Sequence, residues 1–541
     1  MDPANSGPIG SLQAILALIA SWHARARLPT GPKARRAGLS TARTALRGFI
    51  EAERLAAGEK LPATRELARA LGLGRNTVIQ AYLALGELGF VIAHVGQGTF
   101  VAAQRRGEPR QIVRSLRGRA RLPAQLLAPP RSFAWGGLLA LRARDFPPQQ
   151  TLRRVASAGE VLFDFRGGQV DRAVFPRRPL ARALTRALSR HGAALAAHQD
   201  PRGWPPLREE IARALVGRGI VCEPADVVVV GGAQQALDLV GRVLLDPGDT
   251  AVLEQPGYFG AALAFRACGA NLVGVGVDAA GLRTDELARF LRSRRVKLLY
   301  TTPAVQSPTG VVLDETRRRA LVALADQHQV PILEDDYDSE LRLGGPAAPA
   351  LKTLDHAGQV VYVGTFSKAL FPGLRLGYIV AARPLLERIT AAHFAANFQT
   401  SPLGQAALWE LIHDGILERH VRRVRRLYAE RLAALVEAVG RELPEGTRFS
   451  PPAGGTALWV ELPPGADGDA IFTRALEAGV AYTRGDSFTL DGAGSDCLSL
   501  CFANLSPARI AEGLALLGRI VRAHTQRAVR TRRVKTRGMG T

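Results

Sequence analysis

The segment TFSKALFPGLRLGY, Thr365–Tyr378, brings an amine, two hydroxyls and a guanidinium together in one short stretch. Lys368 follows Ser367 directly and Thr365 by three positions, and Arg375 comes seven positions later. A ligand with an aldehyde and a phosphate needs such a set: an amine to form an imine, and hydroxyls with a guanidinium to hold a dianion. Taken alone, the segment also describes a solvated lysine in a glycine-rich turn, so its interpretation depends on the rest of the chain.

Strands and helices alternate around this segment from about residue 160 onward. The apolar, β-branched runs are DVVVV (226–230), TAVLEQPGY (250–258), LLYTTPAVQSPTG (298–310), VPILEDDYD (330–338) and QVVYVGTFSK (359–368). Such runs separated by helices are typical of a largely parallel sheet covered on both faces. A long basic amphipathic helix follows at 420–440, and the strands LWVELP and CLSLCF predict a smaller C-terminal subdomain. The predicted fold class is α/β.

Two further segments carry groups suited to the same ligand. Gly231-Gly232-Ala233-Gln234 ends a strand and opens a helix, where backbone N–H groups favour a phosphate. Tyr258 follows another strand and suits stacking on a flat ring. Each feature has a plainer alternative, a simple turn for the glycines and a core position for the tyrosine.

The acidic segment LEDDYD (333–338) stands at the end of a predicted strand. One of its acids can pair with a protonated pyridine nitrogen, and Tyr337 can hydrogen-bond a ring hydroxyl. The loop QSPTG (306–310) could contact the same ring oxygen. The alternative is a solvated acidic loop, which we expect most for Asp336 and Asp338.

Residues 39–102 have the pattern of a small DNA-reading domain. Helices are predicted over Ser40–Glu53, Thr64–Leu71 and Arg75–Leu88, and FVIAHVGQGTFV (90–101) predicts a β-hairpin. In the last helix Val78, Tyr82 and Leu85 share a buried face, while the N-terminal half leaves Arg75, Asn76, Thr77 and Gln80 free. A helix-turn-helix with a hairpin wing presents a helix N-terminus to the DNA major groove. A module used only for packing is the alternative.

The net charge of +23 is concentrated at the two ends of the chain. Residues 1–150 contain 22 Lys or Arg against 8 Asp or Glu, and residues 519–541 contain 8 Lys or Arg and no acid, so the middle is close to neutral. Basic ends around a neutral domain predict binding to a polyanion. A genome-wide bias toward arginine is the alternative, but it does not explain the neutral middle.

Length and composition exclude several classes of protein. A chain of 541 residues is too long for one core. No uncharged apolar stretch reads as a membrane span, and residues 11–20 predict an amphipathic helix rather than a secretion signal. The four cysteines form no CxxC pair, so we expect a reducing, cytoplasmic setting with no disulfide and no metal site.

The predicted domain order has five parts. They are an N-terminal extension (1–38), the winged helix-turn-helix (39–102), a basic Pro/Arg-rich linker (103–155), the large domain (156–520) and a basic tail (521–541). Residues 103–150 hold 10 Arg and 6 Pro without a helical or strand period, which is typical of a linker. Its arginines could add phosphate contacts, or the segment could be a plain solvated tether.

The N-terminal segments LPATRELARALGLGRNTVIQAYLALGELGFV and GQGTFV resemble the GntR-type winged helix-turn-helix. The resemblance implies an operator in double-stranded DNA as a partner. The implied contact residues are Arg65, Arg75, Asn76, Thr77, Gly96, Gly98 and Thr99.

The segments DPRGWPPLREEIA (200–212), LLDPGDTAVLEQPGY (244–258), LEDDYDSELR (333–342), TFSKALFPGLRLGY (365–378) and ILERHVRRVRRLY (416–428) resemble a fold type I, aminotransferase-like domain. Together with the N-terminal module they are similar to the MocR subfamily of GntR regulators, over roughly residues 40–520. The resemblance implies pyridoxal 5′-phosphate as cofactor, with Lys368 as the imine lysine and Asp335 as the ring-nitrogen partner. It also implies Tyr337 at the ring oxygen, Tyr258 stacked on the ring, and a phosphate held by Ala233, Gln234, Thr365, Ser367 and Arg375.

Several positions depart from the family pattern. Val305 replaces a usual His, Ser307 stands where aminotransferases often have Asn, and His198 lies where a Tyr would reach the neighbouring subunit's phosphate. Ser499 stands where many aminotransferases have the Arg that grips a substrate carboxylate, and Arg484 is a candidate substitute. These departures argue against amino-acid transamination but leave the imine site intact.

Three functions are compatible with these features to different degrees. The first is a bacterial cytoplasmic transcription regulator, a head-to-tail homodimer that senses pyridoxal phosphate or its adduct with an amine or amino acid. The second is an aminotransferase whose DNA-binding module is accessory. The third is a DNA-binding protein without cofactor, against which Lys368, Asp335, Tyr337 and Arg375 argue.

Overall fold

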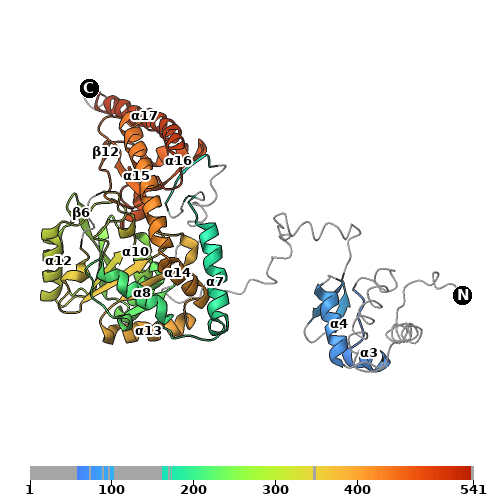
Figure 1. Cartoon of the computed structure of the whole chain (residues 1–541). Helices are drawn as coiled ribbons and strands as arrows, with labels where there is room; N and C mark the ends of the chain where they lie inside the picture. Colours follow the sequence, from blue (N-terminus) through green and yellow to red (C-terminus); the bar gives the residue numbers. More distant parts are fainter. Residues whose placement is uncertain are drawn as a thin grey trace. The chain divides into compact units, whose positions relative to one another are not determined.

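The computed structural model describes residues 58–71, 75–87, 90–94, 98–102, 161–167, 171, 174–344 and 349–537. The chain divides into two compact units, residues 1–133 and 134–541 (Figure 1). Each unit is described by itself below. The predicted extension at 1–38, the helix over Ser40–Glu53, the linker at 103–155 and Gly96 lie outside the described residues.

The N-terminal unit contains two helices and a β-hairpin within its described residues. These elements are α3 (Thr64–Leu71), α4 (Arg75–Glu87), β1 (Val91–His94) and β2 (Gly98–Val101). The strands pair antiparallel, and the chain before α3 adds to them because the Leu61 N–H donates to the Thr99 carbonyl at 2.8 Å. Val78, Tyr82 and Leu85 are buried, so the predicted inner face of α4 is confirmed.

An eight-stranded sheet forms the centre of the large unit. Its strands are β4 (Val227–Val230), β5 (Thr250–Gln255), β6 (Asn271–Asp278), β7 (Gly281–Leu282), β8 (Leu298–Thr301), β9 (Ile332–Asp336), β10 (Val360–Thr365) and β11 (Gly377–Val380). Their order in space is β4-β11-β10-β9-β8-β5-β6-β7. The five strands from β10 to β6 run parallel, whereas β11 is antiparallel to both of its neighbours. The prediction of a largely parallel sheet is confirmed.

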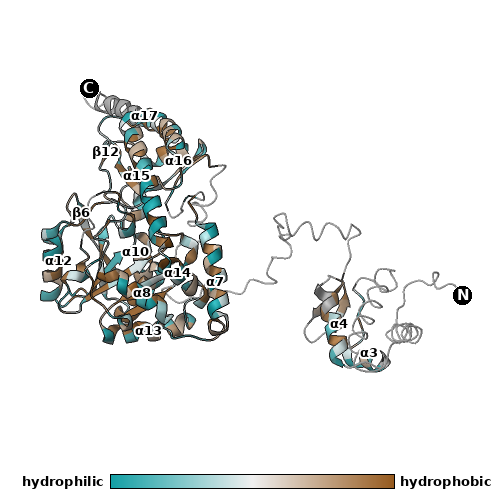
Figure 2. Ribbon diagram, viewed as in Figure 1, coloured by the Kyte–Doolittle hydropathy of each residue, from teal (hydrophilic) through white to brown (hydrophobic). Residues whose placement is uncertain are grey.

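Helices cover both faces of this sheet because its strands are apolar on both sides. They are α7 (Arg177–Leu195), α8 (Pro205–Val216), α9 (Ala233–Leu244), α10 (Phe259–Ala267), α11 (Thr284–Ser293), α12 (Glu315–Gln327), α13 (Arg383–Asn397) and α14 (Pro402–His413). In β4, Val228 and Val230 pack toward α9, α10 and α13, while Val227 and Val229 pack toward α7, α8 and α14. The helices are hydrophobic inward and hydrophilic outward (Figure 2).

A smaller subdomain is built on a second sheet. Its five strands, in spatial order, are β12 (Arg448–Phe449), β13 (Ala457–Glu461), β15 (Cys497–Cys501), β14 (Val480–Arg484) and β3 (Phe163–Phe165). The helices α15 (Ile416–Glu442), α16 (Gly468–Glu477) and α17 (Pro507–Arg537) accompany it. The edge strand β3 comes from before the large sheet in the chain and pairs in parallel with β14.

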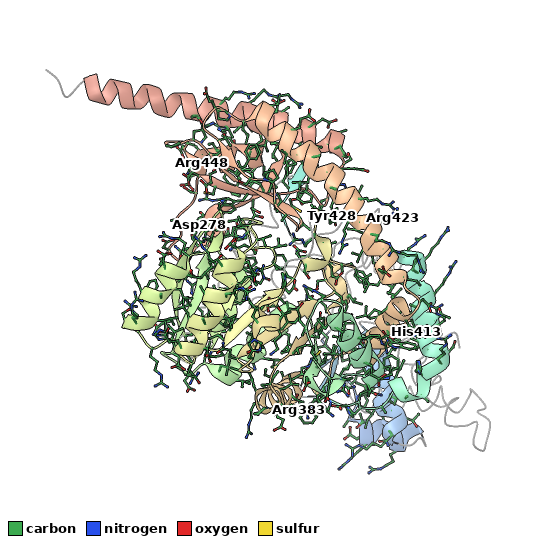
Figure 3. The ribbon with its side chains drawn as sticks, turned by 60° about the vertical axis from the view of Figure 1, so that its left-hand side comes forward. Asp278, Arg383, His413, Arg423, Tyr428 and Arg448 are labelled. Carbon is green, nitrogen blue, oxygen red and sulfur yellow. The ribbon has the colours of Figure 1, made fainter. Side chains whose placement is uncertain are left out.

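The long helices of this subdomain have one buried and one exposed side. On α15, Tyr428 is fully buried while Arg423 is exposed (Figure 3). On α17, Ile510, Leu514, Leu517 and Val521 belong to the subdomain core. The helix runs on to Arg537, so the predicted boundary at 520 falls inside a continuous helix.

Two kinds of feature are absent from the described part of the chain. No helix there is long and apolar enough to cross a membrane. Within the same residues, no group of three or more His, Cys, Asp or Glu side chains could hold a metal ion.

Candidate functional site

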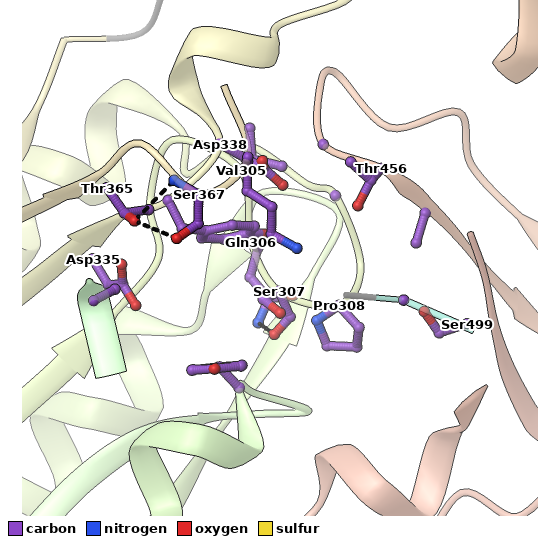
Figure 4. Close-up of a pocket in the computed structure, with 18 of the residues that line it drawn as sticks. Val305, Gln306, Ser307, Pro308, Asp335, Asp338, Thr365, Ser367, Thr456 and Ser499 are labelled. Carbon is purple, nitrogen blue, oxygen red and sulfur yellow. Dashed lines mark hydrogen bonds between the residues drawn. The ribbon is translucent and has the colours of Figure 1, made fainter. Parts of the chain in front are cut away.

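A cavity of about 360 Å³ lies between the large sheet and the small subdomain (Figure 4). All nine residues that the sequence predicts at the cofactor line it. They are Ala233, Gln234, Tyr258, Asp335, Tyr337, Thr365, Ser367, Lys368 and Arg375. They come from segments that are spread over more than a hundred residues of the chain. These segments meet because the strands end, and the following helices start, at one edge of the sheet. The structure thus brings these residues together, while the individual role of each stays a prediction.

One end of the cavity is built to hold an anion. Gly232 has a φ of +91° and precedes α9, and a Cβ there would lie 3.2 Å from Nη2 of Arg375. The Thr365 hydroxyl donates to the Ser367 hydroxyl at 3.1 Å. Arg375 itself has a left-handed φ of +52°, an unusual conformation for a non-glycine residue that often marks a functional site. A helix N-terminus, two hydroxyls and a guanidinium together fit a phosphate dianion.

Asp335 is the last but one residue of β9, and only one of its carboxylate oxygens accepts a hydrogen bond within the described residues. The Tyr300 hydroxyl donates to Oδ2 at 2.9 Å, whereas buried Oδ1 has no hydrogen-bond partner among the described residues. Burial raises the pKa of Asp335 to about 7, against the lowering effect of the Tyr300 hydrogen bond. An orphaned carboxylate oxygen fits a protonated ring nitrogen, which would satisfy it and stabilise its charge.

Two tyrosines border the same space. Tyr258 caps the start of α10, and its hydroxyl donates to Oε1 of Gln234 at 3.2 Å. Burial raises the pKa of Tyr258 to about 12, so its hydroxyl stays protonated. Tyr337 hydrogen-bonds with the side chain of Ser307, and burial also raises the Tyr337 pKa. The QSPTG loop therefore contacts the residue predicted to reach the ring oxygen.

Glu254 holds the QSPTG loop by a hydrogen bond, and it was not identified as a site residue from the sequence. Its buried carboxylate accepts hydrogen bonds from the hydroxyls of Thr301 and Thr302, at 2.5 and 2.7 Å, and from Nε2 of Gln306 at 3.2 Å. Tyr300, the partner of Asp335, was missed as well. The only sign of these two site residues in the sequence was their type, an acid and a tyrosine within strands that are otherwise apolar.

Asp336 and Asp338, expected as solvated, are both buried, so that expectation is wrong. Asp336 is the last residue of β9 and accepts hydrogen bonds from the hydroxyl of Tyr362 on the neighbouring β10, at 2.5 Å, and from Arg218. Asp338 lines the cavity and is only 2% exposed.

Arg484 does not line the cavity, although it was a candidate for gripping a substrate carboxylate. Its guanidinium pairs with Asp469 at 2.6 Å and with Asp486. Ser499 does line the cavity. His198 lies against the ring of Phe398, with ring centroids 5.9 Å apart, and is not among the cavity residues.

The N-terminal unit exposes the side chains predicted to meet DNA. Arg65, Arg75 and Asn76 are exposed and Thr77 is half-buried, at α3 and the start of α4. In the wing, Gly98 has a φ of +119°, and a Cβ there would lie 2.8 Å from Cε of Lys60. The core beneath holds α4 in place, because the Tyr82 hydroxyl donates to the Pro62 carbonyl at 2.7 Å.

The two units match two known families. Residues 174–517 match the family described as aminotransferase class I and II, and residues 40–101 match the bacterial regulatory proteins of the gntR family. The fold and the cavity of the large unit thus define an aminotransferase-like domain, and this fold implies pyridoxal 5′-phosphate as its cofactor.

Relatives and solved structures resemble this chain over most of its length. The probable rhizopine catabolism regulatory protein MocR of Rhizobium meliloti is 33% identical, over 87% of this chain and 90% of its own. The HTH-type transcriptional regulator TauR of Rhodobacter capsulatus is 34% identical, over 86% and 92%. The solved structure of LysN, an α-aminoadipate aminotransferase from Thermus thermophilus, is 34% identical, covers 72% of this chain and 99% of its own, and has a TM-score of 0.68. The chain belongs to the MocR subfamily of GntR-type transcription regulators, in which a DNA-binding winged helix-turn-helix is fused to an aminotransferase-like domain.

Proposed function

We propose that this regulator binds pyridoxal 5′-phosphate covalently at Lys368 and changes its binding to operator DNA when that cofactor, or an amine or amino acid that joins it, occupies the cavity. The observation that carries the proposal is the convergence of nine predicted residues on one cavity. The unpartnered Oδ1 of Asp335 supports it, because such an atom needs a cationic or donor partner.

Each group has a defined task in this proposal. Lys368 supplies the amine that binds the aldehyde, and Asp335 faces the ring nitrogen and keeps it protonated. The N-terminus of α9, Thr365, Ser367 and Arg375 hold the phosphate. Tyr337 donates a hydrogen bond to the ring oxygen, and Tyr258 stacks on the face of the ring. When bound, the cofactor supplies an electrophilic aldehyde and an electron-withdrawing ring.

The proposed assembly is a head-to-tail homodimer in a bacterial cytoplasm. Two copies of the DNA-reading unit would then bind two half-sites of one operator. At each half-site, the start of α4 would enter the major groove while Gly96, Gly98 and Thr99 of the wing contact the backbone. Ligand-dependent regulation requires that the ligand bind two states of this dimer with different affinity.

An aminotransferase with an accessory DNA-binding module is the second candidate. The complete set of cofactor residues favours it. The wall of the cavity that would receive an amino acid argues against it, since Ser499 offers no charge and Arg484 is paired with two carboxylates.

The decisive experiment compares Lys368→Ala with Lys297→Ala, a half-buried lysine that does not line the cavity. Protein reconstituted with pyridoxal 5′-phosphate is reduced with borohydride, and the adduct is located by mass spectrometry. We expect the adduct in the wild type and in Lys297→Ala but not in Lys368→Ala. The affinity of each protein for a DNA fragment selected for binding to the wild type is then measured with and without cofactor. The comparison tests whether the cofactor changes DNA binding.

Two results would contradict the proposal. An adduct that persists in Lys368→Ala places the covalent bond elsewhere. DNA affinity that is the same with and without cofactor and amines, combined with steady production of a keto acid, selects the aminotransferase.

A further inference from the structure

The proposed cofactor residues leave one wall of the cavity unexplained. This wall consists of Gly454, Gly455, Thr456, Ala457, Thr483, Phe488 and Ser499, with Val305 and Asp338 beside them (Figure 4). It offers the three hydroxyls of Thr456, Thr483 and Ser499 but no cationic side chain. Any molecule that binds next to the cofactor meets these groups.

Asp338 is the one charged residue of this wall, and among the described residues its carboxylate accepts no hydrogen bond. No described side chain or backbone N–H donates to its carboxylate, and buried Oδ1 is unpartnered. A Cβ on Gly455 would lie 3.3 Å from Oδ2, so the glycine leaves space beside this oxygen. A buried carboxylate without a donor is destabilising, and the cost is removed when a cation binds to it.

The cationic side chains that a ligand's carboxylate could bind already have other partners or tasks. Among the described residues that line the cavity, only Lys368 and Arg375 are cationic. Both have tasks at the cofactor, one at the aldehyde and one at the phosphate. Arg484 is paired with Asp469 and Asp486 and lies outside the cavity. A ligand carboxylate would therefore meet Asp338 and hydroxyl groups, but no cation that is free to pair with it.

We infer that the cavity beside the cofactor takes a small aliphatic amine or diamine without a carboxylate, whose ammonium group donates to Asp338 while its chain lies against the hydroxyl and glycine wall. The inference rests on the proposed function and narrows its effector to one chemical class. An amino acid is disfavoured on electrostatic grounds, because its carboxylate would lie near the Asp338 carboxylate.

The ionisation of Asp338 is consistent with this role. Burial raises its pKa to about 7, and the nearby Lys368 ammonium acts in the opposite direction. A cationic ligand would favour the ionised carboxylate further.

The test uses the full chain loaded with pyridoxal 5′-phosphate and three probes with related carbon chains. They are 1,4-diaminobutane, ornithine, which adds a carboxylate to it, and 4-aminobutyrate, in which a carboxylate replaces one amino end. Calorimetry is expected to show 1,4-diaminobutane binding at least about tenfold more tightly than either carboxylate, as a charge-assisted hydrogen bond in place of a like-charge contact predicts.

Two substitutions and a control locate the effect. Asp338→Asn keeps the shape and removes the charge, so the preference should shrink to about threefold or less. Asp326→Asn, which removes the same charge from the exposed side of α12, should leave the preference unchanged. Ser499→Arg adds a guanidinium to the wall and should shift the preference toward ornithine. Cofactor absorbance shows that each variant keeps its site.

Three results would overturn the inference. They are tighter or equal binding of ornithine or 4-aminobutyrate by the wild type, an unchanged preference in Asp338→Asn, and binding of none of the probes by protein that still holds cofactor and DNA. The last result would leave the proposed function standing. A wild type that holds no cofactor would instead defeat the proposed function itself.

Discussion

Asp335 and Tyr300 form a hydrogen-bonded pair at the point where we expect the cofactor ring. The Tyr300 hydroxyl donates to Oδ2, whereas buried Oδ1 has no partner among the described residues. Hydrogen bonds to charged groups contribute about 1.5–3 kcal/mol, more than neutral ones. Tyr300 is therefore a positioning residue that acts through Asp335.

Tyr300→Phe should weaken the binding of pyridoxal 5′-phosphate roughly tenfold, because Asp335 no longer has the donor that stabilises its charge. Equilibrium dialysis of the cofactor against the apoprotein measures this. Tyr428→Phe is the matched control, since the buried Tyr428 hydroxyl has no hydrogen-bond partner among the described residues. Equal cofactor affinity in Tyr300→Phe and the wild type would contradict the prediction.

The buried acids predict a pH dependence of stability. Burial raises the pKa values of Glu334, Asp335 and Asp338 to about 7, above their values in an unfolded chain. An acid whose pKa is raised by folding stabilises the protein below its unfolded pKa, and this contribution disappears as pH rises through 7. The melting temperature of the apoprotein should therefore fall between pH 5 and 8.

Asp338→Asn should make that fall smaller, because one of the three acids no longer titrates. Lys368 faces Asp338 and partly offsets the effect, while Asp335 and Asp336 increase it. Thermal unfolding of both proteins across the pH range is the measurement. A fall of the same size in the variant would show that Asp338 does not contribute.

At the level of single residues, the sequence predicted the site residues that stand together in a short motif. It missed the residues that hold those site residues in place by hydrogen bonds. Lys368, Ser367 and Arg375 stand in one segment with a recognisable chemistry. Glu254 and Tyr300 stand inside apolar strands, and only their hydrogen bonds to Gln306 and Asp335 connect them with the site.

Helix α12 depends on a fully buried arginine. The guanidinium of Arg318 is 1% exposed and donates to the carbonyls of Leu313, Pro303 and Pro349, the first two at 2.8 and 2.9 Å. Pro303 and Leu313 lie in the loop between β8 and α12. Pro349 lies in the segment just before η6 (Leu351–Leu354). Arg318 thus ties two loops to one helix.

Arg318→Met should destabilise the large unit by about 3 kcal/mol, because it leaves buried carbonyls without donors. Arg319→Met is the control: Arg319 is exposed and pairs with Glu315 one turn earlier, which contributes about 0.5 kcal/mol or less. Urea unfolding followed by fluorescence compares the two. Equal stabilities of the variants would refute the role given to Arg318.

Helix α4 carries its own prediction. Arg75→Ala should weaken binding to a selected DNA fragment by roughly tenfold or more, since it removes a side chain that we expect to contact DNA at the helix N-terminus. Fluorescence anisotropy measures the affinity. Cofactor absorbance should stay unchanged, and a decrease would show that the two units do not behave as separate modules.

Element prediction succeeded where one local pattern decided the outcome. Four valines in a row predict β4, and the heptad-like spacing of Val78, Tyr82 and Leu85 predicts α4. The pairing of β3 with β14 was not predicted, because it joins segments some three hundred residues apart. Nor was the length of α17, whose basic second half has no apolar period to mark it as helix.

For the whole molecule, the uneven charge predicts steep salt dependence of DNA binding. Residues 526–541 contain six Lys or Arg and no acid, whereas the core positions of α17 end at Val521. Removing residues 526–541 should reduce the slope of log affinity against log salt, by about 0.9 for each phosphate that this tail neutralises, and leave cofactor binding intact. An unchanged slope would exclude this tail from DNA binding.

In the large unit, β3 is the first strand that the structure describes. This strand is hydrogen-bonded to β14, and β14 to β15, and the latter two carry Thr483 and Ser499 into the cavity. The strand that follows the joining segment in the chain therefore belongs to the sheet that a ligand would touch. A ligand that displaces β14 or β15 would act on β3 as well, so occupancy of the cavity could be transmitted along the polypeptide toward the DNA-binding unit.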